Sequence, residues 1–156
     1  EAIAAVDDRV YVFYEANGRV NEHPYALVFD ADLRNQRRVP LQSLEFRITD
    51  VSAPDAEGRV WATNYMWDEA CWNAGPCPLT ARFGLGLTHR GSGTVERLVE
   101  LEVGEGRVRP TDRAPIQLRL AESSRNWEGI VRLGGRGFLI VTDKFPTSIL
   151  GFVPAR

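Results

Sequence analysis

One pattern occurs three times in the chain, and this internal repeat restricts the possible folds more than any other feature. Residues 1–15 align without a gap on residues 128–142, and residues 50–64 follow the same plan with one residue inserted. Each copy begins with an acidic residue, continues through a short apolar run, turns before an arginine and enters a stronger apolar run. A short strand, a hairpin and a second strand produce such a pattern. Repeats of this unit are typical of β-propeller blades.

The rest of the chain also has β character. Residues 10–14, 25–29, 60–63 and 138–141 are rich in β-branched and aromatic side chains, and pairs of Gly, Asn and Asp residues separate them. No stretch keeps a helical period over three turns. We therefore expect an all-β fold of about three four-stranded blades.

The repeat predicts a single partial propeller domain over residues 1–156, with blades at about residues 1–47, 48–120 and 121–156. The third blade is expected to lack its outermost strand, because the chain ends soon after Val153. A blade buries its two apolar faces only between neighbouring blades, and a ring needs about four blades or more. We expect either an upstream half or a second copy of the chain to complete a six-bladed or similar ring. The upstream half is our preferred interpretation.

The acidic residue that opens each copy is the main candidate for a functional site. Inner strands of a propeller run along the central channel, so the repeat directs Glu1, Asp50 and Glu128 toward a common axis. Converging carboxylates favour calcium, which takes about six to eight oxygen ligands. Nearby side chains that could add oxygen atoms are Asn64, Asn126 and Asp143. Alternatively, these acids accept hydrogen bonds from backbone N–H groups on the inner strand of the next blade.

Residues 66–78 carry two cysteines and two tryptophans. Cys71 and Cys77 enclose five residues, which favours a small-loop disulfide over buried or free thiols. A disulfide predicts an oxidising, extracytoplasmic compartment. Trp67 and Trp72 form either a ligand-binding loop on one face of the ring or a cover over an adjacent blade.

Composition and motifs exclude several classes of protein. The 19 basic and 21 acidic residues nearly balance, which argues against a nucleic-acid binder. No apolar run approaches the roughly 18 residues of a membrane-spanning helix. The sequence has no Gly-x-Ser-x-Gly elbow, and the Gly84–His89 stretch lacks the third glycine of a dinucleotide motif. His23 and His89 have no local partner, and we expect both at the surface or at strand edges.

Residues 48–65 and 125–143 resemble bacterial propellers grouped with esterase-like, phytase-related proteins, and more distantly the calcium-dependent lactonase and gluconolactonase propellers. The resemblance covers most of the chain but only about half of a ring. It implies a channel calcium that activates the substrate. The residues that match the ligand types of the lactonase group are Glu1, Asp50, Asn64, Glu128 and Asp143.

Together these features predict an extracytoplasmic propeller that hydrolyses a small ester, lactone or phosphoester, with a channel calcium ion that polarises the carbonyl. The alternative is a non-catalytic propeller that binds a ligand or a protein partner on the face that carries residues 71–77.

Overall fold

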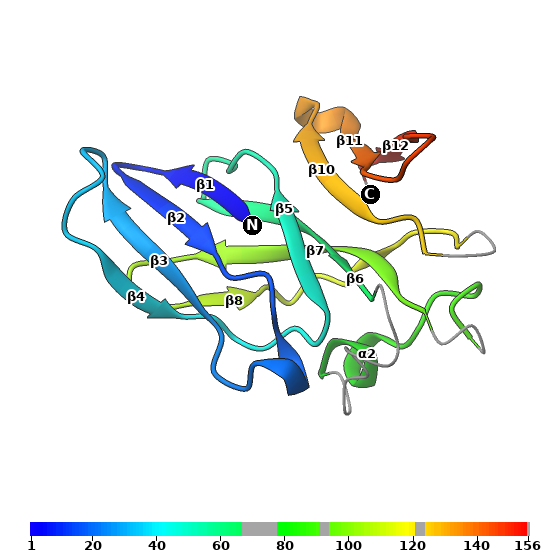
Figure 1. Cartoon of the computed structure of the whole chain (residues 1–156), viewed down its shortest axis with the longest axis horizontal. Helices are drawn as coiled ribbons and strands as arrows, with labels where there is room; N and C mark the ends of the chain where they lie inside the picture. Colours follow the sequence, from blue (N-terminus) through cyan, green and yellow to red (C-terminus); the bar gives the residue numbers. More distant parts are fainter. Residues whose placement is uncertain (67–77, 91–93, 121–123, 156) are drawn as a thin grey trace.

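The described residues form three antiparallel β-sheets that follow one another along the chain (Figure 1). The computed structural model describes residues 1–66, 78–90, 94–120 and 124–155. In each sheet, neighbouring strands are successive in sequence, with one short strand as the exception. This arrangement follows from the alternating apolar and polar residues and the tight turns between them.

The first sheet has four strands in the order β1-β2-β3-β4. Their bounds are β1 Ala2–Val6, β2 Arg9–Phe13, β3 Tyr25–Asp30 and β4 Arg37–Pro40. A two-residue turn joins β1 to β2, since Val6 pairs with Arg9. Asp7 in this turn has a φ of 54°, a conformation that aspartate tolerates better than most residues.

The second sheet has five strands in the order β5-β6-β7-β8, and β9 also pairs with β7. Their bounds are β5 Arg47–Val51, β6 Arg59–Tyr65, β7 Glu96–Val103, β8 Val108–Pro110 and β9 Ile116–Gln117. The long insertion that separates the second and third copies of the repeat lies partly between β6 and β7. It includes the short helix α2 (Pro78–Phe83).

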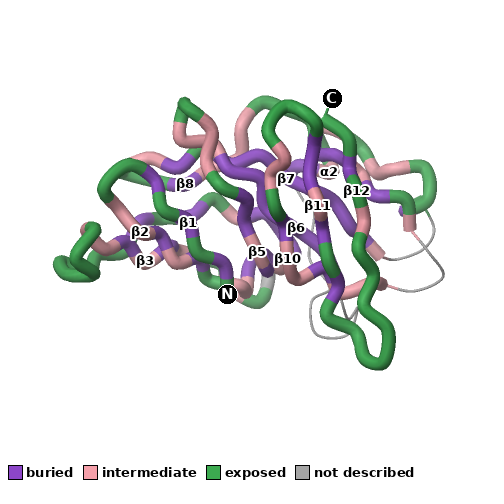
Figure 2. Tube along the Cα trace, turned by 90° about the horizontal axis from the view of Figure 1, so that it is seen from above, coloured by how far each residue is buried: buried purple, intermediate pink, exposed green. Residues whose placement is uncertain are grey.

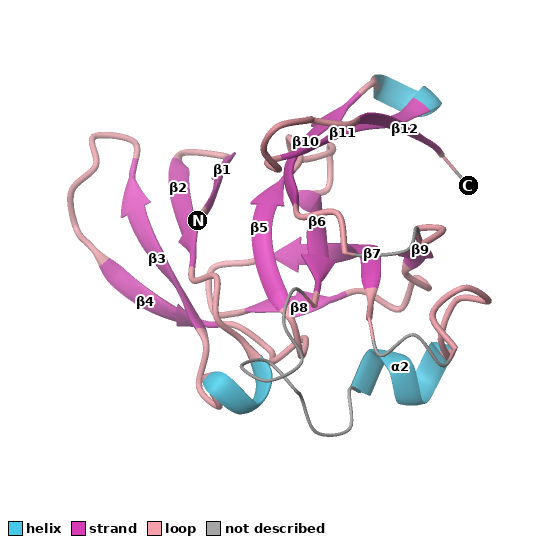
Figure 3. Ribbon diagram, turned by 45° about the vertical axis from the view of Figure 1, so that its right-hand side comes forward, coloured by secondary structure: helices cyan, strands magenta, loops and turns pink. Residues whose placement is uncertain are grey.

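The third sheet has three strands, β10 (Trp127–Arg132), β11 (Gly137–Thr142) and β12 (Leu150–Pro154), in that order. A 3-10 turn, η2 (Gly134–Arg136), connects β10 to β11, and a similar turn, η1 (Gly18–Val20), precedes β3. Figure 3 shows that these short helical segments lie at the margins of the sheets.

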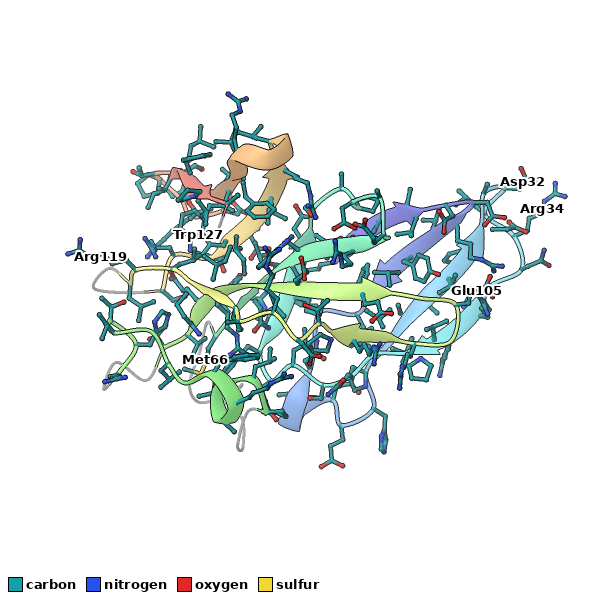
Figure 4. The ribbon with its side chains drawn as sticks, turned by 180° about the vertical axis from the view of Figure 1, so that it is seen from behind. Asp32, Arg34, Met66, Glu105, Arg119 and Trp127 are labelled. Carbon is teal, nitrogen blue, oxygen red and sulfur yellow. The ribbon has the colours of Figure 1, made fainter. Side chains whose placement is uncertain are left out.

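The second sheet is covered on both faces. One cluster of buried apolar side chains joins it to the first sheet and includes Phe13, Val28, Val60 and Leu101. A second cluster joins it to the third sheet through Trp61, Leu98, Trp127, Phe138 and Ile140. Figure 2 shows the concentration of buried residues along β6 and β7, and Figure 4 shows Trp127 between the third sheet and the second. Stacking of the three sheets therefore creates the core.

The first strands of the three sheets are neighbours in space. β5 is in contact with β1 on one side and with β10 on the other. The Thr49 hydroxyl donates a hydrogen bond of 2.6 Å to the Trp127 carbonyl, and the Ile48 N–H donates one of 3.1 Å to the Glu15 carbonyl. These bonds fix the second sheet to both of its neighbours.

The all-β class is confirmed, and each copy of the repeat forms a hairpin. Among the described residues the sheets contain four, five and three strands, and none of them is closed. The second sheet has one strand more than expected, and the third lacks a fourth strand, as expected. The expectation for His89 is wrong in part. The part of it that is wrong is the surface position, because this side chain is buried. Its Nε2 lies 3.0 Å from the carbonyl oxygen and 3.1 Å from the amide nitrogen of Glu96, the first residue of β7, so the position beside a strand end is as expected.

Candidate functional site

Charged side chains from all three sheets meet where β1 and β5 begin and β10 starts. We call Glu1, Glu15, Arg47, Tyr65 and Glu128 the mouth cluster. Arg47, the first residue of β5, forms an ion pair with Glu15 and lies 3.7 Å from Glu1 Oε2. Its guanidinium carbon is 5.4 Å from the centre of the Tyr65 ring. The arginine thus links the second sheet to the first through charge.

Tyr65 links the second sheet to the third. Its hydroxyl oxygen lies 2.7 Å from Asn126 Oδ1 and 2.5 Å from Glu128 Oε1. The Asn126 side-chain nitrogen donates a 2.7 Å hydrogen bond to the Asp143 carbonyl, so Oδ1 is the amide atom that faces Tyr65. Because a tyrosine hydroxyl has a single proton, it cannot fully satisfy both oxygen atoms as a donor. All three contacts are satisfied when Tyr65 donates to Asn126 and a protonated Glu128 donates to Tyr65.

The electrostatics of the cluster shift Glu128 toward its neutral form. Burial, and then the negative charges of Glu15 and Asp143, raise the pKa of Glu128 above its ordinary value, against the opposing effects of Tyr65 and Arg47. Burial, followed by repulsion from Glu15 and Glu128, also raises the pKa of Glu1. A carboxylate environment that favours the neutral acid is typical of groups that hold or transfer protons.

A cavity of about 360 Å³ reaches the cluster from the outer face of the first sheet. Glu1 and Glu15 lie at one side of it, and the remainder is mostly apolar. Those further lining residues are Val12, Phe13, Tyr14, Ala16, Tyr25 and Leu27. The volume is within the range of small-molecule pockets.

The structure brings Glu1 and Glu128 into one cluster but places Asp50 elsewhere. Glu1 directly precedes β1, Glu128 is the second residue of β10, and Asp50 is the fourth residue of β5. Asp50 Oδ2 accepts a 2.8 Å hydrogen bond from the Ile130 N–H, which is the alternative role foreseen for these acids. Burial raises the pKa of Asp50, and this hydrogen bond opposes the shift.

The two other predicted ligands also lie in different surroundings. Asn64 is fully buried, its Nδ2 donates to the Arg47 carbonyl at 3.0 Å, and its Oδ1 accepts a 2.7 Å bond from Arg97 Nε. Asp143 is exposed and influences Glu128 through its charge. Across residues 1–66, 78–90, 94–120 and 124–155, no three His, Cys, Asp or Glu side chains are grouped closely enough to hold a metal ion. Trp67, Cys71, Trp72 and Cys77 lie outside the described residues.

Sequence reasoning missed Arg47, Tyr65 and Glu15 because it followed the acidic residue that opens each copy of the repeat, and none of these three is at that position. The β5–β6 pairing shifts between Ile48 and Val51, and the β10–β11 pairing shifts between Trp127 and Gly129. Such bulges redirect the side chains beside them. Position was the available signal. Tyr65 directly follows the second copy of the repeat, Arg47 lies three residues before it, and the two pair with each other across β5 and β6.

A second group of buried charges has a structural role. Glu96 is fully buried and accepts hydrogen bonds from the Arg125 guanidinium and from Trp127 Nε1, the latter at 3.0 Å. These bonds fasten the segment before β10 to the central strand β7. Every charge in the group is compensated, which is a condition for burying ionised side chains.

Comparison of the chain with protein-family models, with curated proteins and with solved structures finds no match. None of the helices in the described part of the chain is both long enough and apolar enough to cross a membrane. The geometry of the chain itself is therefore the basis for assigning a function.

Proposed function

We propose that the three sheets are consecutive blades of a β-propeller. Three observations support this proposal: each sheet is built from successive antiparallel strands, the first strands of the sheets are neighbours, and the second sheet is buried on both faces. Blades stack through apolar faces in the same way.

Two apolar faces support further blades on either side. On the third sheet, Val131, Val141, Leu150 and Phe152 are exposed on the side away from the second sheet. On the first sheet, Ile3 and Tyr14 are exposed on the corresponding outer side. Exposed apolar areas of this kind mark surfaces that another element covers. An upstream half of the ring, or a second copy of the chain, would cover both.

We further propose that the mouth cluster is the active site of an extracytoplasmic hydrolase of esters, lactones or phosphoesters. The observation that carries the proposal is the hydrogen-bonded series Asn126–Tyr65–Glu128, whose contacts are all satisfied when Glu128 is the neutral acid. A carboxylic acid kept neutral by its surroundings can act as a general acid. Water would add to the carbonyl carbon or the phosphorus and lose a proton to the Glu1 carboxylate. The bond from that carbon or phosphorus to the leaving oxygen would break as Glu128 gives its proton to this oxygen.

Calcium fits this site only in part. Glu1 and Glu128 repel each other and would gain from a nearby cation. In contrast, the side-chain oxygen of Asn64 already accepts a hydrogen bond from Arg97, and a carboxylate oxygen of Asp50 accepts one from Ile130. A calcium ion would therefore need oxygen ligands from other blades. If bound, it would polarise the substrate oxygen.

The competing proposal is a non-catalytic propeller that binds a ligand or a protein partner. The ion pairs of Arg47 support it, because they hold Glu1 and Glu15 as a rigid polar surface. The proposed extracytoplasmic location rests on Cys71 and Cys77. A mass difference of two hydrogen atoms between the oxidised and the reduced protein would support the location.

The two functions predict different behaviour of Glu128→Gln. For a hydrolase, this substitution removes the transferable proton and lowers the rate of p-nitrophenyl acetate, γ-lactone or p-nitrophenyl phosphate hydrolysis by about a hundredfold or more. Glu105→Gln, which alters an exposed carboxylate paired with Arg9, should leave the rate unchanged. An unaltered rate in Glu128→Gln, or no hydrolysis by the unmodified protein with and without calcium, would contradict the hydrolase.

A further inference from the structure

A second cavity lies between the second and third sheets and shares no residue with the mouth cluster. Its volume is about 360 Å³. Strand β6, the segment before β9, strand β10 and the β10–β11 turn all contribute to its wall. The lining residues are Trp61, Arg113, Ala114, Pro115, Ile116, Arg132, Gly134, Gly135, Gly137, Phe138 and Ala155. Most of this wall is apolar, and two arginines are its charged members.

The arginines lie over two aromatic rings. The ring centres of Trp61 and Phe138 are 5.4 Å apart, with an interplanar angle of 51°. The guanidinium carbon of Arg113 is 5.6 Å from the Trp61 ring centre, and that of Arg132 is 5.7 Å from the Phe138 ring centre. Stacking on aromatic faces holds a guanidinium in place while its edge remains able to donate hydrogen bonds.

The two arginines differ in how their charge is balanced. Arg113 forms a 3.2 Å ion pair with Glu100, a buried carboxylate on β7. Arg132 donates from Nη2 to the Arg59 carbonyl at 3.2 Å, and its Nε is buried without a hydrogen-bond partner. No carboxylate in the described part of the chain forms an ion pair with Arg132, and none of the lining residues is acidic. The cavity wall therefore contains a positive charge that an anion would compensate.

We propose that this cavity binds a small monocarboxylate with an apolar, preferably aromatic, body, and that Arg132 receives the carboxylate. The apolar wall favours the body of such a ligand, and a guanidinium matches a carboxylate through two parallel hydrogen bonds. The site is independent of the proposed hydrolase, because its residues lie in a different part of the sheet interface.

Benzoate is a suitable probe, and benzyl alcohol is its uncharged counterpart. Ligand-observed NMR titration at constant ionic strength should show benzoate binding and much weaker binding of benzyl alcohol. Arg132→Gln should weaken benzoate binding about ten- to a hundredfold, which is the usual effect of removing a hydrogen bond to a charged group. Arg136→Gln is the matched control, because Arg136 is exposed in the same turn and does not line the cavity. It should bind benzoate as the unmodified protein does.

Ala114→Trp provides a second variant. Ala114 is exposed and lines the cavity, so a large side chain there should narrow it without disturbing the core. We expect weaker benzoate binding with an unchanged melting temperature. Three results would overturn the proposal: no benzoate binding to the unmodified protein, equal losses in Arg132→Gln and Arg136→Gln, or undiminished binding in Arg132→Gln.

Discussion

At the scale of single residues, the mouth cluster depends on one proton. The geometry around Tyr65 accommodates the neutral form of Glu128, since the ionised form would leave Asn126 Oδ1 or Glu128 Oε1 facing an oxygen atom without a hydrogen between them. The pKa of Glu128 is thus higher in the folded chain than in the unfolded chain, where the side chain is surrounded by water. Its ionisation is therefore coupled to the stability of the fold.

This coupling predicts how stability changes with pH. The pKa of Glu128 is raised above 4.5 in the folded chain, so its contribution to stability is complete below about pH 4.5 and is lost as pH rises through the folded-state pKa. Glu1 acts in the same direction. Denaturant unfolding between pH 4 and pH 8 should show the free energy of unfolding of the unmodified protein falling relative to that of Glu128→Gln. A constant difference between the two proteins would contradict the proton on Glu128.

Residue types alone could predict part of this site. Glu1 and Glu128 were foreseen because both open a copy of the repeat, and the structure brings them together. Asp50 opens a copy as well, but it lies at the fourth residue of β5 and bonds to the backbone of β10. The position of the acid relative to the start of its strand therefore differs by a few residues between Glu128, which joins the cluster, and Asp50, which does not. Register irregularities lie beside both Asp50 and Glu128, and neither has a clear sequence signature in this chain.

At the scale of elements, the hairpins and the positions of their turns were predictable, and the conformations of the turns were not. The β1–β2 connection is a two-residue turn, whereas the equivalent β10–β11 connection contains a 3-10 turn and ends at Gly137. Gly137 has a φ of 139°, and a side chain there would collide with the Val153 carbonyl oxygen on β12. Here glycine is required by the close approach of two strands.

Replacement of Gly137 by alanine should therefore weaken the third sheet. We expect Gly137→Ala to lower the free energy of unfolding by about 1–3 kcal/mol, because the collision must be relieved by separating β11 from β12. Gly135→Ala is the control from the same turn, since a Cβ atom there meets nothing within 4 Å. It should change stability by less than about 0.5 kcal/mol. Equal effects of the two substitutions on the free energy of unfolding in urea would show that the close approach of β11 and β12 does not require glycine at residue 137.

At the scale of the whole molecule, the two end sheets each leave an apolar face uncovered. Leu150 is 71% exposed and Phe152 is 56% exposed, although both belong to a strand. The repeat predicts uncovered faces only for the proposed propeller, since three blades would be too few for a ring. It could not predict which side chains would lie on the uncovered faces, because that depends on how the second sheet packs between its neighbours.

The 156-residue chain studied alone should therefore bind a hydrophobic dye such as ANS or associate with itself. Substitution of both Leu150 and Phe152 by serine should reduce dye fluorescence and association while the melting temperature changes little, because these side chains add little to the core. Serine at Ile140, which is buried on the opposite face of the same sheet, is a control that should lower stability. A monomer that binds no dye would argue against further blades on this face.

Because Arg47 reaches the first sheet and Tyr65 reaches the third, the mouth cluster exists only when all three sheets are docked. A single sheet, or a pair, would lack part of the cluster and so the surroundings that favour the neutral form of Glu128. Assembly of the sheets and maturation of the site are thus one event. A misassembled molecule would show no activity or binding in an assay of the site. The pKa of Glu128 would therefore report whether the three sheets are docked.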